Sequence, residues 1–194
     1  MAESEHLGID LPGELVGERV ILRPWRESDA AAFFALVDRS REHLSRWLAW
    51  PDQYQSVDDA RPFLRRSAAL WLLREEFVLG IFTHAGELLG SVGLHPRNWK
   101  VSAFEIGYWI GAPYEGKGYM SEAVRLATKL AFETLGANRV MIRCDAKNER
   151  SAAVARRCGY VLEGTLRNDV VMPPQILSDA LLFAMIPADY VAAR

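Results

Sequence analysis

Short runs in which apolar residues follow one another or alternate with polar ones predict β-strands along much of this chain. Residues 77–83 and 88–94 are two such runs, and the turn-forming stretch between them, which contains Gly86, predicts a hairpin. Residues 19–24 predict an earlier strand that ends at Pro24. Four later strands are expected over residues 101–111, 140–144, 161–168 and 177–186.

Helices are predicted where apolar residues recur at helical spacing. Asp29 is a typical N-cap residue for the helix expected after it, and Ser56 with Asp59 resembles a capping box at the start of another. After Gly118 a long helix is expected, which Gly136 ends. Shorter helices are predicted over residues 44–50 and 150–157.

The order of these elements predicts one α/β (α+β) domain over residues 19–190. Helices separate several of the strands, but the alternation is not regular enough for a doubly wound parallel sheet. We therefore expect a mixed sheet of six or seven strands, with an antiparallel N-terminal half and flanking helices. Residues 1–18 are interrupted by glycine and proline and are expected to form a flexible arm.

Composition and charge narrow the classes of function. The chain has 194 residues, half of them hydrophobic, which suits one domain with a substantial core. A formal net charge of −2 gives no general attraction for nucleic acid or anionic lipid, so neither is expected as a partner. The acidic N-terminal segment has no secretory pattern and no apolar stretch is long enough for a membrane span, so a cytoplasmic location is expected.

Two local features bear on ligands. The two cysteines, Cys144 and Cys158, lie in predicted regular structure, and no Cys/His spacing typical of zinc occurs, so no metal is expected. Basic residues cluster between residues 139 and 157. That cluster is either a solvated helix face or part of a locally built anion site.

A glycine-rich turn joins a predicted strand to the long helix. Gly116 and Gly118 allow a tight turn there and leave backbone N–H groups directed outward at a helix N-terminus, where phosphate binds well. Lys117 adds a positive charge. The spacing from Gly111 also matches the start of a nucleotide-binding P-loop, but the Ser or Thr that would hold magnesium is replaced by Gly118.

An ordered series of motifs is more specific than the turn alone. It runs from residues 104–110 through the turn at residues 116–119 to Asn148-x-x-Ser151, and ends at residues 159–164. In this order the motifs resemble those of GNAT acetyltransferases, and most closely those of the RimJ/RimL group of ribosomal-protein N-terminal acetyltransferases. The resemblance covers residues 19–186.

The resemblance implies an enzyme that uses acetyl-CoA as co-substrate. Strand 104–111 is expected to splay from strand 139–145, leaving a wedge for the pantetheine arm beside Asn148. The turn is expected to hold the coenzyme's pyrophosphate through backbone amides. The residues implied for coenzyme binding are Trp109, Ile110, Glu115, Gly116, Lys117, Gly118, Tyr119, Met120, Asn148 and Ser151.

Two positions depart from the superfamily's usual pattern. Pro113 replaces a Gln or Arg before the turn, and Ala155 replaces a tyrosine that donates a proton to the departing thiolate. Ser151 is therefore the candidate proton donor, as the equivalent serine is in the related group. The alternative is that Ser151 only caps the following helix.

Glu105 is the best-placed candidate for drawing a proton from the amine through water, because it lies on the strand that would line the wedge. The alternative is a structural partner for a nearby cation or backbone group. Weaker candidates for the same role are Asp169, Asp179 and His95.

The acceptor amine is expected to have a low pKa. An α-amino group with a pKa of about 7.7–8 is roughly one-fifth neutral near pH 7.2, whereas lysine is below about 0.1% neutral, so a protein N-terminus needs only a weak base. Trp47 and Trp50, together with Glu105, are candidates for binding this acceptor, although aromatic residues at helical spacing are often core.

Two rival functions stay open at this point. Acetylation of a polyamine or an aminoglycoside would need an acidic cleft, and the early segments do contain Asp52, Asp58, Asp59, Glu75 and Glu76. A non-catalytic module that binds acyl-CoA is the other rival. The pattern also leaves open a homodimer formed through the aromatic surface and the last strand.

Overall fold

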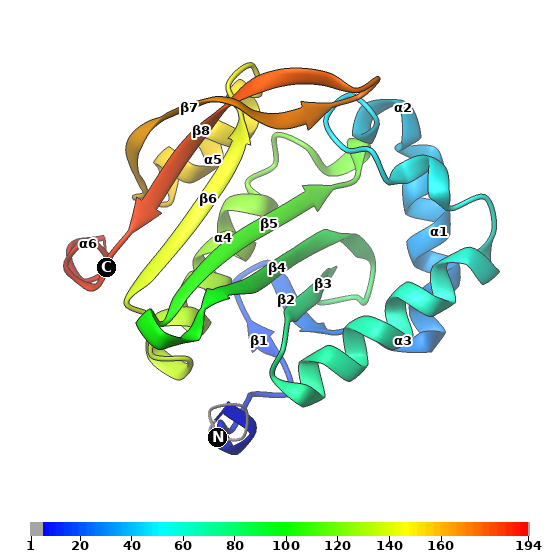
Figure 1. Ribbon diagram of the computed structural model, residues 1–194. Helices are drawn as coiled ribbons and strands as arrows, with labels where there is room; N and C mark the ends of the chain where they lie inside the picture. The colour runs from blue at the N-terminus through cyan, green and yellow to red at the C-terminus, as the bar shows by residue number, and fades with distance from the viewer. Residues whose placement is uncertain (1–5, 194) are drawn as a thin grey trace.

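A computed structural model of the chain describes residues 6–193. Within that range, eight strands form one sheet in the order β1-β2-β3-β4-β5-β6-β8-β7 (Figure 1). Only the β5–β6 pair is parallel, so the predicted mixed sheet with an antiparallel N-terminal half is confirmed. The strands are β1 (Leu15–Val16), β2 (Val20–Pro24), β3 (Phe77–Thr83), β4 (Leu88–Asn98), β5 (Ala103–Ile110), β6 (Arg139–Asp145), β7 (Val161–Met172) and β8 (Ile176–Met185).

The strand beyond the predicted six or seven is β1, which lies inside the segment expected to be an arm. Leu15 pairs with Leu22 of β2, and Ile9 accepts hydrogen bonds through its carbonyl from the Arg74 side chain. A two-residue strand has too few positions to show alternation, which is why the pattern did not reveal it. Residues 1–5 of the predicted arm lie outside the described residues.

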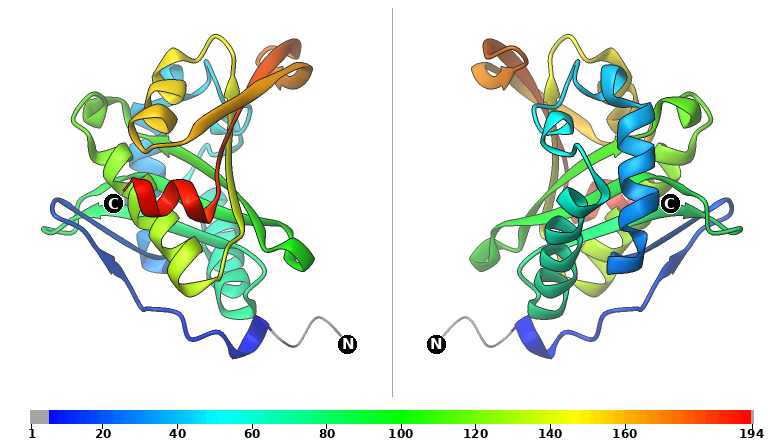
Figure 2. Two further views of the ribbon diagram at one scale, coloured as in Figure 1. Left: turned by 90° about the vertical axis from the view of Figure 1, so that its left-hand side faces the viewer. Right: turned by 90° about the vertical axis from the view of Figure 1, so that its right-hand side faces the viewer.

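Helices cover both faces of the sheet (Figures 1 and 2). The first three helices lie on one face and α4 and α5 on the other. The α-helices are α1 (Ala30–Arg39), α2 (Arg41–Leu44), α3 (Val57–Leu73), α4 (Tyr119–Lys129), α5 (Glu149–Arg157) and α6 (Pro187–Ala192). A π-helical turn, η6 (Leu130–Thr134), continues α4, and short 3-10 turns lie at η1 (His6–Gly8), η2 (Glu27–Asp29), η3 (Pro51–Gln53), η4 (Trp99–Val101) and η5 (Ala112–Tyr114).

Of the two predicted N-cap residues, Ser56 caps its helix with a side-chain hydrogen bond and Asp29 does not. Ser56 caps α3, since its hydroxyl accepts from the Asp59 N–H at 3.3 Å and donates to the Asp59 carboxylate at 2.8 Å. Asp29 stands at the start of α1, but its carboxylate accepts from the Arg23 guanidinium and from the Arg26 N–H instead. Burial favours the neutral form of Asp29, yet these hydrogen bonds outweigh it and hold its pKa below the usual value.

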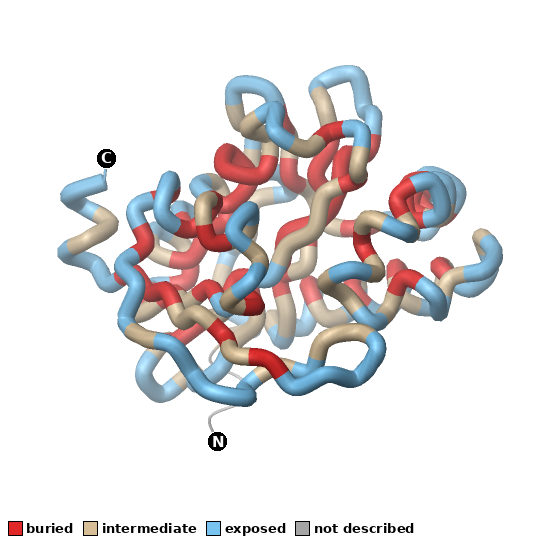
Figure 3. Tube along the Cα trace, turned by 90° about the horizontal axis from the view of Figure 1, so that it is seen from above, coloured by how far each residue is buried: buried red, intermediate tan, exposed pale blue. Residues whose placement is uncertain are grey.

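The core fills the space between the sheet and both helical layers (Figure 3). Phe33, Leu36 and Val37 of α1 are buried against one face, and Ala123 and Ala127 of α4 against the other. None of the helices in residues 6–193 is long and apolar enough to span a bilayer.

Candidate active site

The two parallel strands at the centre of the sheet separate before they end. Pairing of β5 with β6 runs from Ala103 opposite Arg139 to Ile106 opposite Ile142, whereas β5 continues to Ile110. The strands therefore diverge beyond Ile106, which is the wedge expected between them. Each still pairs with its other neighbour, β4 or β8, so the wedge opens within an otherwise continuous sheet.

The glycine-rich turn lies at the mouth of this wedge, between β5 and α4. Gly116 and Gly118 have φ angles of +71° and +81°, a region that side-chain-bearing residues rarely occupy. No atom lies within 4 Å of a Cβ built at Gly116, so its backbone faces open space. The first N–H groups of α4, at Tyr119 and Met120, have no acceptor within the helix and are available to a phosphate.

Arg19 and Glu122 hold the turn from behind. The Arg19 guanidinium donates to the Lys117 carbonyl at 2.9 Å and to Glu122 Oε2 at 3.0 Å, while Glu122 Oε1 accepts from the N–H groups of Arg19 and Val20. Burial alone would raise the pKa of Glu122, but these hydrogen bonds lower it below its usual value. The turn is thus anchored to the first long strand of the sheet.

The side chains of the turn point in different directions. Glu115 lines the cavity described below and accepts from Arg150, with His43 Nε2 at 3.4 Å from its other oxygen. The Lys117 ammonium instead lies 5.8 Å from the centre of the Tyr114 ring, and Lys117 is outside the cavity lining. Any contribution of this turn to phosphate binding therefore comes from its backbone.

A cavity of about 730 Å³ runs from this turn through the wedge to the β7–β8 hairpin. Most of the residues predicted to bind coenzyme line it. They are Trp109, Ile110, Glu115, Gly116, Gly118, Tyr119, Met120, Asn148 and Ser151. The volume suits an extended ligand, because typical small-molecule pockets hold about 300–1,000 Å³.

Ser151 lies on the cavity wall in the first turn of α5, and it is not the residue that caps this helix. Asn148 is the N-cap, because its Oδ1 accepts from the Ser151 N–H at 3.1 Å. The Ser151 hydroxyl is 2.9 Å from the Tyr108 hydroxyl. Burial raises the pKa of the Cys144 thiol beside it, although a hydrogen bond with Ser151 acts in the opposite direction.

Glu105 is engaged on both carboxylate oxygens. Arg97 donates to one at 2.8 Å and Arg143 to the other at 3.1 Å, and Arg143 also donates to Asp169 at 2.8 Å. Arg143 and Asp169 line the cavity, whereas Glu105 lies outside its lining. This geometry favours the structural interpretation of Glu105 over that of a proton acceptor.

Asp145 is a cavity residue that the sequence patterns did not single out. It is 6% exposed, and its Oδ1 accepts from the Lys147 N–H at 2.7 Å. Within residues 6–193 its Oδ2 is buried without a hydrogen-bond partner. It adjoins Cys144 at the end of β6, and a buried strand-end carboxylate has no sequence pattern of its own.

The two tryptophans proposed for the acceptor occupy different environments. Trp47 lines the cavity. Trp50 packs against Phe33, Tyr54 and Trp109, with ring centroids 5.5 to 6.4 Å apart, and is partly buried against the core. Trp50 is also outside the cavity lining, so of these two residues only Trp47 is placed to touch an acceptor.

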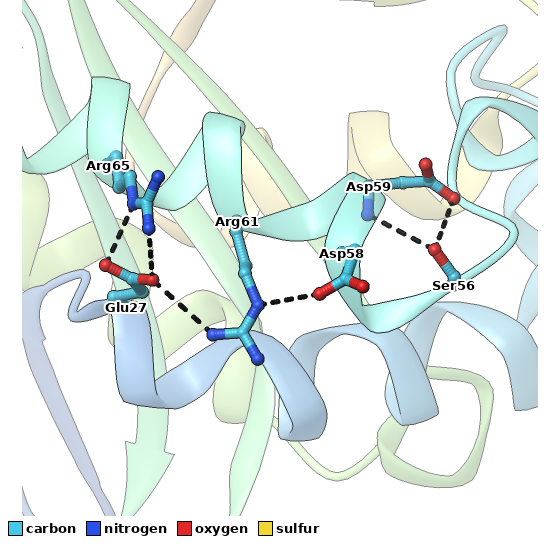
Figure 4. Close-up of polar contacts among 6 residues, drawn as sticks. All are labelled: Glu27, Ser56, Asp58, Asp59, Arg61 and Arg65. Carbon is cyan, nitrogen blue, oxygen red and sulfur yellow. Dashed lines mark hydrogen bonds and ion pairs between the residues drawn. The ribbon is translucent and has the colours of Figure 1, made fainter.

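The acidic residues that would favour a polycation lie elsewhere. Asp58 pairs with Arg61 at 2.9 Å, and Asp59 contacts Ser56 in the cap of α3 (Figure 4). Glu76 lies 3.8 Å from His95, and Asp52 lines a separate cavity of about 220 Å³. None of these, nor Glu75, lines the large cavity among the described residues.

The three weaker candidates for the proton acceptor each have a polar partner. Asp179 accepts from the Asn168 N–H at 2.9 Å, and His95 faces Glu76. Neither lines the large cavity, whereas Asp169 does so while paired with Arg143.

Comparison with known proteins gives a consistent picture. The model of the acetyltransferase (GNAT) domain family matches residues 19–161. The Bacillus subtilis (strain 168) protein named "Putative ribosomal N-acetyltransferase YdaF" is 32% identical over 156 residues, covering 79% of this chain and 84% of that protein. The ribosomal-protein-serine acetyltransferase of Escherichia coli (strain K12) is 27% identical over 152 residues, covering 77% of this chain and 84% of that protein.

Solved structures agree with the sequence comparison. The structure of RimL, described as an alpha-N-protein acetyltransferase in complex with coenzyme A, superposes with a TM-score of 0.83 at 25% identity. That match covers 89% of this chain and 97% of RimL.

Proposed function

Since the chain belongs to the GNAT acetyltransferase family, we propose that this acetyl-CoA-dependent N-acetyltransferase acts on the N-terminal α-amine of a protein, with ribosomal proteins as the class of acceptor. The observation that carries the proposal is the single cavity that joins the phosphate-binding turn to the aromatic and hairpin residues on the acceptor side. Relatives named as ribosomal-protein acetyltransferases support the acceptor class.

The coenzyme half of the site rests on backbone groups. The N–H groups of residues 116–120 would hold the pyrophosphate, and the dipole of α4 adds to their attraction. The exposed edges of β5 at Trp109 and Ile110 would pair with the pantetheine amides, because β6 has diverged at this level. These contacts need no basic side chain in the turn, which agrees with the outward position of Lys117.

The reaction is direct attack in a ternary complex. The amine nitrogen forms a bond to the acetyl carbon, the bond from that carbon to sulfur breaks, the nitrogen loses a proton and the sulfur gains one. Ser151 would give a proton to the sulfur, and the position of its side chain on the cavity wall beside Cys144 supports this role. Its own proton is replaced from solvent, which receives the proton that the nitrogen releases.

Of the three carboxylates among the described cavity residues, Glu115 and Asp169 are paired with arginines, and Asp145 keeps one oxygen without a hydrogen-bond partner. Glu105 is held by two arginines and would act by orienting Arg143 and Asp169. An α-amine is partly neutral at physiological pH, so it can react without a strong base. A polyamine lacks this low pKa, and two of the three described carboxylates that line the cavity are already neutralised by arginines, which leaves little negative charge to bind it.

Thiol release from acetyl-CoA tests the proposal. A peptide with a free N-terminus should turn over at least about tenfold faster than the same peptide with a blocked N-terminus and a free lysine, and faster than spermidine. Equal or faster turnover of spermidine or the lysine peptide would contradict an α-amine acceptor. Mass spectrometry of the product peptide locates the acetyl group.

A further inference from the structure

Tyr108 occupies the point where the central strands separate. The last β5–β6 pair joins Ile106 to Ile142, and Tyr108 and Cys144 follow two positions later on the two strands. Side chains two residues apart lie on the same face of a strand, so Tyr108 and Cys144 face the side that carries α5. Both line the large cavity together with Ser151.

The Tyr108 hydroxyl reaches across the wedge to α5. It lies 2.9 Å from the Ser151 hydroxyl and 3.1 Å from the Ser151 carbonyl oxygen. A phenol has a single proton, which the Tyr108 hydroxyl can donate either to the Ser151 carbonyl or to the closer Ser151 hydroxyl oxygen. When Tyr108 donates to the hydroxyl oxygen, the serine's own proton stays free for another acceptor. Asn148 holds the N–H of the same serine, so Ser151 is bound on its backbone and on its side chain.

We propose that Tyr108 is the positioning residue for Ser151, fixing the serine hydroxyl in the orientation from which it gives its proton to the departing thiolate. The inference rests on the proposed function of Ser151 as proton donor. A serine hydroxyl otherwise samples three staggered rotamers, and one fixed partner selects among them. Ala155 is completely buried and has no side-chain donor, whereas the phenol that contacts Ser151 comes from β5.

Tyr108 keeps its own proton throughout the reaction. Burial raises the pKa of its phenol, which disfavours the tyrosinate. When the bond between carbon and sulfur breaks, the sulfur takes the proton of the Ser151 hydroxyl while Tyr108 donates its hydrogen bond to the serine oxygen, and Ser151 then recovers a proton from solvent. The role of Tyr108 is thus exerted through the serine and should vanish when the serine hydroxyl is removed.

A double-mutant cycle tests this dependence. Tyr108→Phe keeps the ring and removes the hydroxyl, and we expect it to lower kcat for thiol release by about 3–20-fold while the KM for acetyl-CoA and the Kd for coenzyme A stay within about twofold. In the Ser151→Ala background the same change should lower kcat by less than about twofold. An undiminished effect of Tyr108→Phe in that background, or an unchanged kcat in the single variant, would overturn the inference.

Tyr160→Phe is the matched control. Tyr160 is also buried and its hydroxyl lies 2.7 Å from the Thr128 hydroxyl, but it is outside the cavity lining. It should leave kcat within about twofold, so a loss equal to that of Tyr108→Phe would assign both effects to packing and overturn the inference. A wild-type protein that releases no thiol with any amine would instead overturn the proposed function, and the inference with it.

Discussion

The two ends of the cavity are built in different ways. The proposed coenzyme end is a turn of consecutive residues whose backbone would bind the pyrophosphate, and Arg19 and Glu122 fix it from behind. The proposed acceptor end is lined by side chains of α2 and its following loop, β6 and the β7–β8 hairpin, among them Trp47, Arg143 and Asp169. Ligand binding by backbone groups tolerates substitution of the side chains around it, whereas ligand binding by side chains changes when any one of them is substituted. Single substitutions can distinguish these two ends from each other and from the reacting centre between them.

The largest effect is expected at the reacting centre. Ser151→Ala should lower kcat for thiol release by about 10–100-fold, because it removes the proton donor, and should leave the Kd for coenzyme A largely unchanged. Steady-state kinetics and calorimetry measure the two quantities. Unchanged turnover would remove Ser151 from the mechanism.

Disruption of the coenzyme end should come next. Gly118→Val places a side chain at φ +81°, where an added Cβ already lies 3.1 Å from Arg19, and should raise the Kd for coenzyme A by about tenfold or more. Gly86→Val is the matched control, since Gly86 has φ +85° with open space around it in the β3–β4 turn. Equal weakening of coenzyme binding by both variants would mean that backbone strain alone explains the loss.

The acceptor end should respond in KM rather than in coenzyme affinity. Trp47→Ala is expected to raise the KM for an N-terminal peptide by about 3–10-fold with little change in the Kd for coenzyme A, because Trp47 lines the acceptor side. Trp50→Ala should instead lower the free energy of unfolding by about 3 kcal/mol, since Trp50 packs in the aromatic core. The reverse assignment in thermal unfolding and peptide kinetics would contradict the placement of these two tryptophans.

The smallest expected effect is on how the free energy of unfolding depends on pH. Glu122 and Asp29 have folded-state pKa values below their ordinary values of 4.5 and 3.8, so both are more easily protonated when unfolded. Their contribution is present above about pH 4.5 and is lost as the pH falls through the lowered values. Glu122→Gln should reduce the loss of stability between about pH 5 and pH 3 by roughly 1 kcal/mol, as measured by urea unfolding. An identical pH dependence in wild type and variant would exclude Glu122 as a source.

The same contrast explains which parts of the molecule could be predicted from the sequence. Gly116, Gly118 and the Ser56 cap depend on neighbours within a few residues, so local spacing was enough. The ion pairs of Glu105 join residues 97, 105 and 143, and no local pattern specifies that their side chains meet. The partners of Glu105 could therefore be identified only from the packed strands.

Tyr108 illustrates a contact that could not be predicted from the sequence. Its place in a strand was predicted, but its contact with Ser151 spans 43 residues and depends on how far β5 and β6 diverge. Trp50 shows a related case, in which a residue before a proline was predicted to bind the acceptor and its ring packs against Tyr54 and Trp109. Packing of this kind follows from the tertiary structure and not from helical spacing.

The outermost position of β7 has a consequence for how such enzymes diversify. Among the strands of residues 6–193, β7 pairs with β8 alone, so an insertion, a deletion or a shift of register there leaves β1 to β6 in place. Duplicated genes could therefore acquire new acceptors by changes in this hairpin alone, while the inherited machinery for the acyl donor is preserved. Proteins of such a lineage would keep the same acyl donor and differ in the acceptor amine.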